Sequence, residues 1–307
     1  MAIQSGEFET IQRRTKGLSF SALALGLAEN PQGPLVICLH GFPDTPRTYR
    51  NQLPLLVGAG YRVIAPLLRG YEPSSQPGNR DYSVLSLVDD VLDWVDHLDI
   101  EGVHLVGHDW GAAIACAAGS IAPARFQSLT LIACTNFTRA SNVLRNVPRQ
   151  ALLSWYINFF QLRGIAEVAL KRPGWPLLRK LWRDWAPGYA LPPKEWELLI
   201  RELEQPGVID AALSYYRQNA SPGVFLGWRK LGLEGKAEVD VRTLVVAGLE
   251  DGCFDSRIFE HIYLQEDFPR GLRIEKLAGA GHFPHLERPE LFNTLLLEWL
   301  AADSIAV

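Results

Sequence analysis

The sequence predicts an α/β fold in which a mostly parallel, doubly wound sheet carries an inserted block of helices. Short continuous apolar runs alternate with segments whose apolar residues recur every three or four positions, which is typical of strands buried on both faces and of the helices between them. A stretch rich in aromatic residues, Pro and Gly interrupts this alternation before it resumes. The chain of 307 residues is long enough for one large domain with such an insertion.

The expected strands begin with an N-terminal pair and continue through the sheet. The pair covers Phe8–Thr15 and Leu18–Leu27. Basic residues before Leu18 imitate a signal peptide, but serines alternate with apolar residues after it, which favours a strand. The later apolar runs predict buried strands at Leu35–Leu39, Arg62–Ala65, Val103–Val106, Leu129–Ala133, Thr243–Ala247 and Arg273–Leu277.

Helices are expected between these strands and inside the inserted block. Apolar periodicity predicts sheet-covering helices at Tyr49–Gly58, Val84–Leu98, Gly111–Ile121 and Pro289–Ala302. The inserted block runs from about Asn136 to Ser221, and in it or just after it lie Trp155, Trp175, Trp182, Trp185, Trp196 and Trp228. We therefore expect a core domain made of residues 1–135 and 223–307 and a helical lid domain made of residues 136–222.

Composition excludes several classes of function. The net charge is −4, the pI is about 6.0 and the sequence has no basic run. It therefore does not predict a basic surface that binds nucleic acid or an anionic membrane. No apolar window is long enough for a spanning helix. The four cysteines (Cys38, Cys116, Cys134, Cys253) lack the spacing of a zinc site or a disulfide scaffold. We expect a cytoplasmic protein with reduced cysteines that acts on a small molecule.

The sharpest chemical signal is Gly107-His-Asp-Trp-Gly111, which follows an expected strand and opens an expected helix. Its pattern is that of a nucleophile elbow, where glycines permit the tight turn that exposes the central side chain. The central residue is Asp109 rather than Ser, and an ionised carboxylate can attack an sp3 carbon such as that of an epoxide or alkyl halide. The alternative interpretation is an ordinary turn with a helix-capping Asp.

An ester formed on Asp109 requires a base that activates water, and His282 is the candidate. It lies in Gly279-Ala-Gly-His-Phe-Pro-His285, directly after the last expected strand. His285 and His261 are rivals. The Gly-Ala-Gly sequence before it and its position after the last expected strand favour His282 over both.

The base in turn requires an acidic partner that fixes its tautomer. Asp251 follows the strand Thr243–Ala247 in the sequence Gly-Leu-Glu-Asp-Gly, with Glu250 and Asp255 as alternatives. The order nucleophile, acid, histidine is the order that hydrolase folds of this kind use. Backbone N–H groups of Phe42 and Trp110 are the expected oxyanion donors.

Five segments together resemble the epoxide hydrolase branch of the α/β-hydrolase family. They are HGFPD at 40–44, RGYEPSS at 69–75, GHDWG at 107–111, GLEDG at 248–252 and GAGHFPHLERP at 279–289. The resemblance covers nearly the whole chain. Glu72, where relatives commonly have a small residue, and Gln161-Leu-Arg163 depart from the family pattern, which leaves the lid shape and substrate preference open.

This resemblance implies two lid tyrosines that hydrogen-bond an epoxide oxygen. Tyr156 and Tyr216 match them, with Tyr215 as the rival for the second. A phenol is a suitable donor to the alkoxide that forms as the ring opens. Further pocket or supporting positions implied by the resemblance are His40, Pro43, His108 and Trp155.

The expected reaction is the hydrolysis of a small-molecule epoxide by water to a vicinal diol, without a cofactor or metal, in a monomer or homodimer. Haloalkane dehalogenase, which shares the Asp-His-Asp arrangement, is the nearest alternative. A ligand-sensing protein without catalytic activity is a remote alternative of another class.

Overall fold

The computed structural model describes residues 8–302, except residues 99, 101, 135–138, 140–142, 144 and 221–237. The expected boundaries between core and lid, and Trp228, lie outside the described residues.

Eight strands form one sheet in the order β1-β2-β4-β3-β5-β6-β7-β8. The first two strands pair with each other antiparallel, and β2 also pairs antiparallel with β4, whereas the remaining neighbours are parallel. The strands are β1 (Glu9–Thr15), β2 (Leu18–Leu25), β3 (Leu35–Leu39), β4 (Arg62–Pro66), β5 (Val103–His108), β6 (Phe126–Ile132), β7 (Thr243–Gly248) and β8 (Leu272–Leu277). The predicted mostly parallel sheet is confirmed, and β1 and β8 are its edges.

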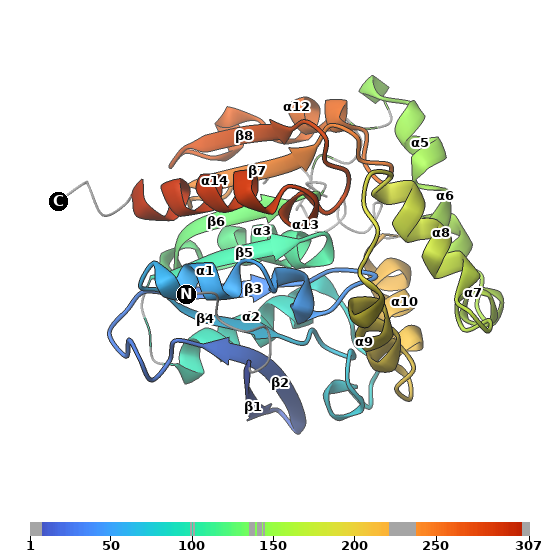
Figure 1. The fold of residues 1–307 in the computed structure, drawn as a ribbon, viewed down its shortest axis with the longest axis horizontal. Coiled ribbons are helices and arrows are strands. Elements are labelled where there is room, and N and C mark those ends of the chain that lie inside the picture. Colours follow the sequence, from blue (N-terminus) through green and yellow to red (C-terminus); the bar gives the residue numbers. More distant parts are fainter. Residues whose placement is uncertain are drawn as a thin grey trace.

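Helices cover both faces of the sheet (Figure 1). Because successive side chains of a strand point to opposite faces, β3 divides its residues between two cores. Leu35 and Ile37 join the core that includes α2 (Val84–His97) and α3 (Trp110–Ile121). Val36 and Cys38 join the core beneath α1 (Leu53–Gly58) and α14 (Pro289–Ala301). Each strand buried on both sides therefore needs an unbroken apolar sequence, which is the pattern that predicts it.

Some expected boundaries differ from those observed. Strand β6 begins at Phe126 rather than Leu129, and the helix expected at Tyr49–Gly58 is divided into the 3-10 turn η1 (Pro46–Tyr49) and α1. Each of these two elements has a proline in its first turn, where the missing N–H group costs no helical hydrogen bond. The short elements that connect the core are η2 (Pro73–Ser75), η3 (Pro123–Arg125), η5 (Ser256–Ile258), α12 (Phe259–Ile262), η6 (Gln265–Asp267) and α13 (Pro284–Glu287).

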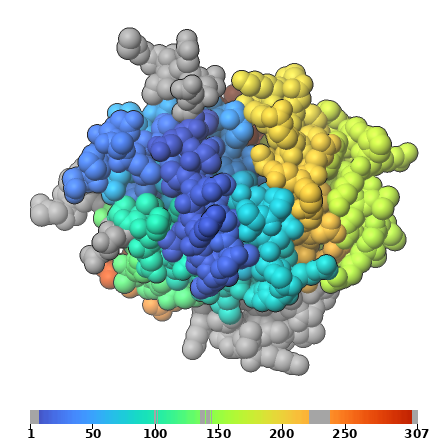
Figure 2. All heavy atoms as spheres, turned by 90° about the horizontal axis from the view of Figure 1, so that it is seen from below, coloured from blue at the N-terminus to red at the C-terminus, as the bar shows by residue number. Residues whose placement is uncertain are grey.

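The inserted helices lie together at one side of the sheet, beyond the carboxyl ends of the parallel strands (Figure 1). They are α5 (Arg149–Leu153), α6 (Trp155–Phe160), α7 (Ile165–Leu170), α8 (Pro176–Trp185), α9 (Pro193–Leu203) and α10 (Val208–Asn219). Seen from below, the yellow and yellow-green lid helices lie beside the blue N-terminal hairpin and the cyan loops of the core (Figure 2). None of the described helices has the length and apolar character that crossing a membrane requires.

The lid is fastened directly to the loops that carry the candidate site. The Trp182 ring stacks on Phe283 at a centroid distance of 4.0 Å and an angle of 3°. The backbone N–H of His282 donates to the carbonyl of Trp185 at 2.9 Å. Helix α8 therefore contacts the expected base itself and the residue that follows it.

Candidate active site

Asp109 lies at a strained turn between β5 and α3. Its φ is 51°, a left-handed value that is costly for a residue with a Cβ atom. The turn is closed tightly, since a Cβ on Gly107 would come within 2.3 Å of the Gly111 carbonyl oxygen and a Cβ on Gly111 within 2.1 Å of the Leu39 carbonyl oxygen. Glycine is thus required on both sides of Asp109, and the strain marks the position as a candidate for function.

The two carboxylate oxygens of Asp109 have different surroundings. Oδ1 accepts a hydrogen bond from the backbone N–H of Phe42 at 2.8 Å. Oδ2 faces Nε2 of His282 at 3.6 Å. Trp110, the other expected N–H donor, is the first residue of α3. One oxygen is therefore held by the backbone while the other faces the expected base.

His282 and Asp251 form the expected pair. Nδ1 of His282 is 3.1 Å from Oδ2 of Asp251, and the backbone N–H groups of Cys253 and Phe254 donate to Oδ1 of Asp251 at 2.6 and 3.0 Å. Asp251 is thus fixed in place by its own loop. The alternatives lie elsewhere, because Glu250 is exposed and Asp255 pairs with the Arg257 side chain.

The pKa of His282 reflects opposing influences. Burial alone would lower it, but Cys253 and the carboxylates of Asp251 and Asp109 outweigh burial and raise the pKa well above its ordinary value. By contrast, burial lowers the pKa of His285 well below its ordinary value, and Nε2 of that ring is 2.6 Å from the hydroxyl of Thr48. Only one of these two histidines faces the Asp109 carboxylate.

A small cavity of about 40 Å³ lies above Asp109. The described residues that line it are Asp109, Trp110, Ala113, Cys134, Tyr156, Ile157, Tyr216, Ala220 and Phe254. Core and lid thus both contribute to its wall, with polar groups from Asp109 and two tyrosines. An apolar lining with a few convergent polar groups is typical of a small-molecule site, whereas the volume is smaller than the roughly 300–1,000 Å³ of such sites.

The tyrosines Tyr156 and Tyr216 approach this cavity from two lid helices, with ring centroids 5.8 Å apart. The Tyr156 hydroxyl is 3.2 Å from Sγ of Cys253. The buried Tyr216 hydroxyl has no hydrogen-bond partner of ordinary geometry among the described residues. Burial raises the pKa of both phenols well above the ordinary value, so both hold their protons at neutral pH.

Tyr215 points away from the cavity. Its hydroxyl donates to the backbone carbonyl of Arg69 at 2.8 Å. Adjacent residues of a helix diverge by about 100°, so only one of Tyr215 and Tyr216 can face Asp109. The geometry favours Tyr216.

Trp155 does not meet the expectation that it lines the pocket. It is 38% exposed, and Lys180 lies over its ring at 5.7 Å. The reason is again helical geometry, because turning Tyr156 inward turns Trp155 outward.

The other expected positions support the site from behind. Nε2 of His108 lies 2.9 Å from the carbonyl of His282, and the Pro43 carbonyl accepts from the Trp182 indole at 3.3 Å. Nε2 of the buried His40 accepts from the Leu68 N–H at 3.1 Å. Burial lowers the pKa of His40 to about 4, so this ring is neutral at pH 7.

Several residues around the site were not identified from the sequence. The Glu287 carboxylate accepts from the N–H groups of Gly281 and Phe283 at 2.8 and 2.9 Å, on either side of His282. Gln150 of the lid bonds the Cys253 carbonyl at 2.8 Å and the Asp255 N–H at 2.8 Å. Glu287 stands in the quoted HLERP segment, whereas nothing in the sequence around Gln150 marks it.

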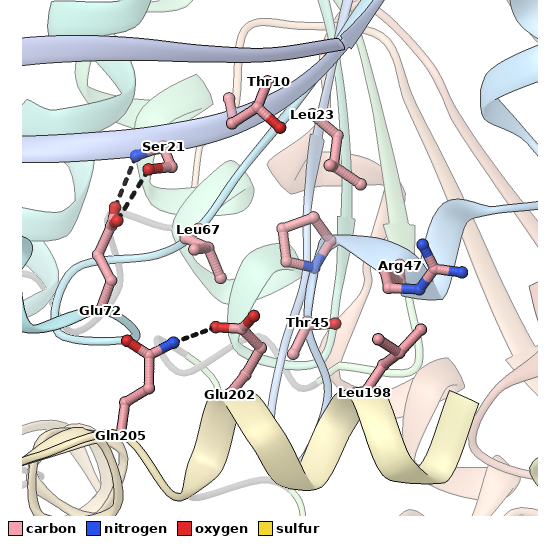
Figure 3. Close-up of a pocket in the computed structure, with 12 residues that line it drawn as sticks. Thr10, Ser21, Leu23, Thr45, Arg47, Leu67, Glu72, Leu198, Glu202 and Gln205 are labelled. Carbon is pink, nitrogen blue, oxygen red and sulfur yellow. Dashed lines mark hydrogen bonds between the residues drawn. The ribbon is translucent and has the colours of Figure 1, made fainter. Parts of the chain in front are cut away.

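A separate hollow of about 340 Å³ lies between the N-terminal hairpin, the core loops and α9 (Figure 3). Glu72 accepts from the backbone and hydroxyl of Ser21 there, and Glu202 is bonded to Gln205. None of the described residues that line this hollow is a histidine or cysteine. It is larger than the cavity at Asp109.

Comparison with known proteins agrees with this fold. The sequence profile of the alpha/beta hydrolase fold matches residues 34–289. The chain is also 32% identical over 293 residues to the AB hydrolase superfamily protein YfhM of Bacillus subtilis (strain 168), covering 93% of this chain and 96% of that protein. The chain belongs to the α/β-hydrolase fold family.

Other members of this family that resemble the chain are named epoxide hydrolases. An epoxide hydrolase of Caballeronia sordidicola is 31% identical over 223 residues, which cover 69% of this chain and 60% of that protein. The crystal structure of a Bacillus megaterium epoxide hydrolase in complex with an inhibitor superimposes with a TM-score of 0.81 at 26% identity, covering 94% of this chain and 99% of that one.

Proposed function

We propose that this α/β hydrolase is an epoxide hydrolase that converts a small epoxide and water to a vicinal diol through an ester on Asp109. One observation carries the proposal: a carboxylate at the nucleophile elbow shares a cavity with two protonated lid phenols, Tyr156 and Tyr216. The names of the Caballeronia sordidicola and Bacillus megaterium relatives support it.

In the first step Oδ2 of Asp109 attacks an epoxide carbon and the ring C–O bond breaks. The ring oxygen takes a proton from Tyr156 or Tyr216, so that no free alkoxide has to form in the apolar cavity. The product of this step is a hydroxyalkyl ester of Asp109. Its carbonyl oxygen is Oδ1, which the Phe42 N–H already contacts at 2.8 Å.

In the second step His282 removes a proton from water, and the water oxygen adds to the ester carbonyl carbon. The negative charge on Oδ1 is stabilised by the N–H groups of Phe42 and, as we propose, Trp110. Collapse of this intermediate expels the diol oxygen, to which His282 returns the proton. Asp109 is left as a carboxylic acid and releases its proton to solvent, and the tyrosine that lost its proton regains one from solvent.

The pKa of His282 is expected to change between the two steps. His282 is protonated readily in the free enzyme, because Asp109 and Asp251 both raise its pKa. Ester formation removes the charge of Asp109, so the pKa of His282 falls. The histidine thus becomes a better acceptor for the proton of water only after the ester exists.

Haloalkane dehalogenase remains the second candidate, because it uses the same three residue types. That reaction needs N–H donors to a halide ion. Here the cavity offers two phenols, and the residue after His40-Gly41 is Phe42 rather than a polar residue. These features favour the epoxide.

The deciding experiment is a single turnover of a styrene-oxide-type epoxide in ¹⁸O-labelled water, followed by mass analysis of the peptide that contains Asp109. We expect label in Asp109 and loss of turnover in Asp109→Ala. Diol formation with no label in Asp109 would exclude the ester. Halide release from alkyl halides without turnover of any epoxide would favour dehalogenase.

The division into a core of residues 1–135 and 223–307 and a lid of residues 136–222 is part of this proposal, as is the role of each residue named above. A cytoplasmic location and a monomeric or homodimeric state stay predictions.

A further inference from the structure

Cys253 brings a third kind of metal-binding atom to the candidate acid and base. Oxygen of Asp251, nitrogen of His282 and Sγ of Cys253 all lie within 4.8 Å of one another, and all three residues are buried. We propose that these residues form an inhibitory site for a thiophilic divalent cation such as Zn²⁺ or Cd²⁺. The site would share Asp251 and His282 with the proposed reaction, which as written above needs no metal ion.

The distances suit a tetrahedral ion. Zn²⁺ binds sulfur at about 2.3 Å and nitrogen or oxygen at about 2.0–2.2 Å, so neighbouring donors around it are roughly 3.3–3.6 Å apart. The Nδ1 of His282 and Oδ2 of Asp251 are already 3.1 Å apart. The remaining donor pairs lie within 4.8 Å of each other, so the side chains would have to rotate to bring them into range. The Tyr156 hydroxyl, 3.2 Å from Sγ, or a water molecule completes the coordination.

The backbone prepares two of the three donors. Asp251 is held through Oδ1 by the Cys253 and Phe254 N–H groups, which leaves Oδ2 directed at His282. The Cys253 carbonyl is held by the Gln150 side chain at 2.8 Å. A donor set that is fixed before the ion arrives loses little conformational entropy on binding.

Binding would inhibit the enzyme by separating the acid from the base. The Cys253 thiol gives up its proton to solvent as sulfur coordinates the ion. Nδ1 of His282, which needs its proton to bond Asp251, releases that proton to solvent and becomes a metal ligand instead. The ring then no longer presents Nε2 to water in the correct orientation. A mixed sulfur, nitrogen and oxygen set selects Zn²⁺ and Cd²⁺ over Mg²⁺ and Ca²⁺, which prefer oxygen ligands alone.

The test measures metal binding without reference to turnover, so its outcome is independent of the proposed function. Cd²⁺ is titrated into the metal-free protein, and the ultraviolet thiolate-to-cadmium charge-transfer absorption is followed. We expect saturation at one ion per chain. Cys253→Ala is expected to weaken this binding by more than about tenfold, because even loss of an outer-shell partner costs 10–100-fold. The matched control is Cys134→Ala, a buried cysteine that lines the cavity at Asp109 but is not one of the three proposed ligands, and it should keep the absorption.

A second variant keeps the proposal open to refutation if Cys253→Ala fails to fold. His282→Asn retains the thiol and should weaken Cd²⁺ binding to a similar degree. Equal Cd²⁺ binding in wild type, Cys253→Ala and His282→Asn would overturn the proposal. So would absorption that is lost in Cys134→Ala but kept in Cys253→Ala. Inhibition of turnover by Zn²⁺, reversed by a chelator and absent with Mg²⁺, is the expected consequence in the active enzyme.

Discussion

At Asp109 the backbone determines what each carboxylate oxygen does. The strained φ of 51° turns Oδ1 toward the Phe42 N–H and Oδ2 toward His282. We expect Asp109→Ala to lower turnover by on the order of 10⁶-fold, the order of loss found when a nucleophile is removed. Epoxide turnover and far-ultraviolet circular dichroism measured together check this. A folded variant with substantial turnover would exclude Asp109 as the nucleophile.

In the proposed mechanism both lid phenols can donate to the ring oxygen, so each should partly compensate for loss of the other. We expect Tyr156→Phe and Tyr216→Phe each to lower kcat by about tenfold, and the double variant by on the order of 10²–10⁴-fold, the usual contribution of a positioned acid. The control is Tyr215→Phe, whose hydroxyl bonds the Arg69 carbonyl instead. A larger loss of kcat in Tyr215→Phe than in Tyr216→Phe would reverse the assignment.

In the proposed mechanism Asp251 acts through its contact with His282 rather than on substrate. Because its carboxylate raises the pKa of His282, Asp251→Asn should lower that pKa. The base is then free at lower pH, so the acidic limb of the rate of ester hydrolysis should shift to lower pH. The maximum rate should fall by on the order of 10⁴-fold, since the tautomer is no longer fixed. Stopped-flow measurement of ester hydrolysis against pH tests both effects, and an unshifted limb would contradict them.

Among the elements, α10 links lid and core through Asn219. Its Oδ1 accepts from the N–H of Val84, the first residue of α2, at 2.8 Å, and its amide donates to the Tyr82 carbonyl at 2.8 Å. The lid therefore caps a helix of the core. Asn219→Ala leaves a buried N–H unsatisfied, and we expect a loss of about 1–3 kcal/mol in the free energy of unfolding. Urea denaturation measures it. The control is Ser214→Ala on the same helix, whose hydroxyl bond is exposed, and a loss of equal size there would argue against capping.

Helices and strands could be predicted from the sequence where packing requires an uninterrupted pattern of apolar residues. Strand β3, buried throughout, was predicted with its observed bounds, because both faces demand apolar residues. The start of β6 was not, since Gln127 is exposed and interrupts the apolar run. Helix α13 was also missed, because four residues are too few to show periodicity.

The candidate site was predictable in so far as short motifs fix it. Asp109, Asp251 and His282 each follow a strand, and parallel strands bring their carboxyl ends to one edge. The direction of the lid side chains depends on how short helices are rotated, which no local pattern specifies. That is why Trp155 was expected at the pocket, and why the contact between Cys253 and Tyr156 was not foreseen.

In the whole molecule, an aromatic stack and an ion pair join the lid to the core. Trp182 stacks on Phe283, and Arg47 of the core forms a two-point ion pair with Glu195 of α9 at 2.7 and 2.8 Å. We expect a single unfolding transition, with far-ultraviolet circular dichroism and tryptophan fluorescence giving the same midpoint. Trp182→Ala should destabilise the protein by about 3–5 kcal/mol. Two separated transitions in the wild type would show that the lid unfolds by itself.

The two edges of the sheet bear on how the protein behaves when it is concentrated. An unpaired edge strand is a template onto which another chain can add and begin a fibril. Here β1 carries Arg13 and Arg14, and β8 carries Arg273, Glu275 and Lys276. A second copy joining either edge would have to strip water from these charges. We therefore expect the folded protein to resist polymerisation through its sheet. Aggregation on storage would then indicate unfolded chains rather than native molecules joined edge to edge.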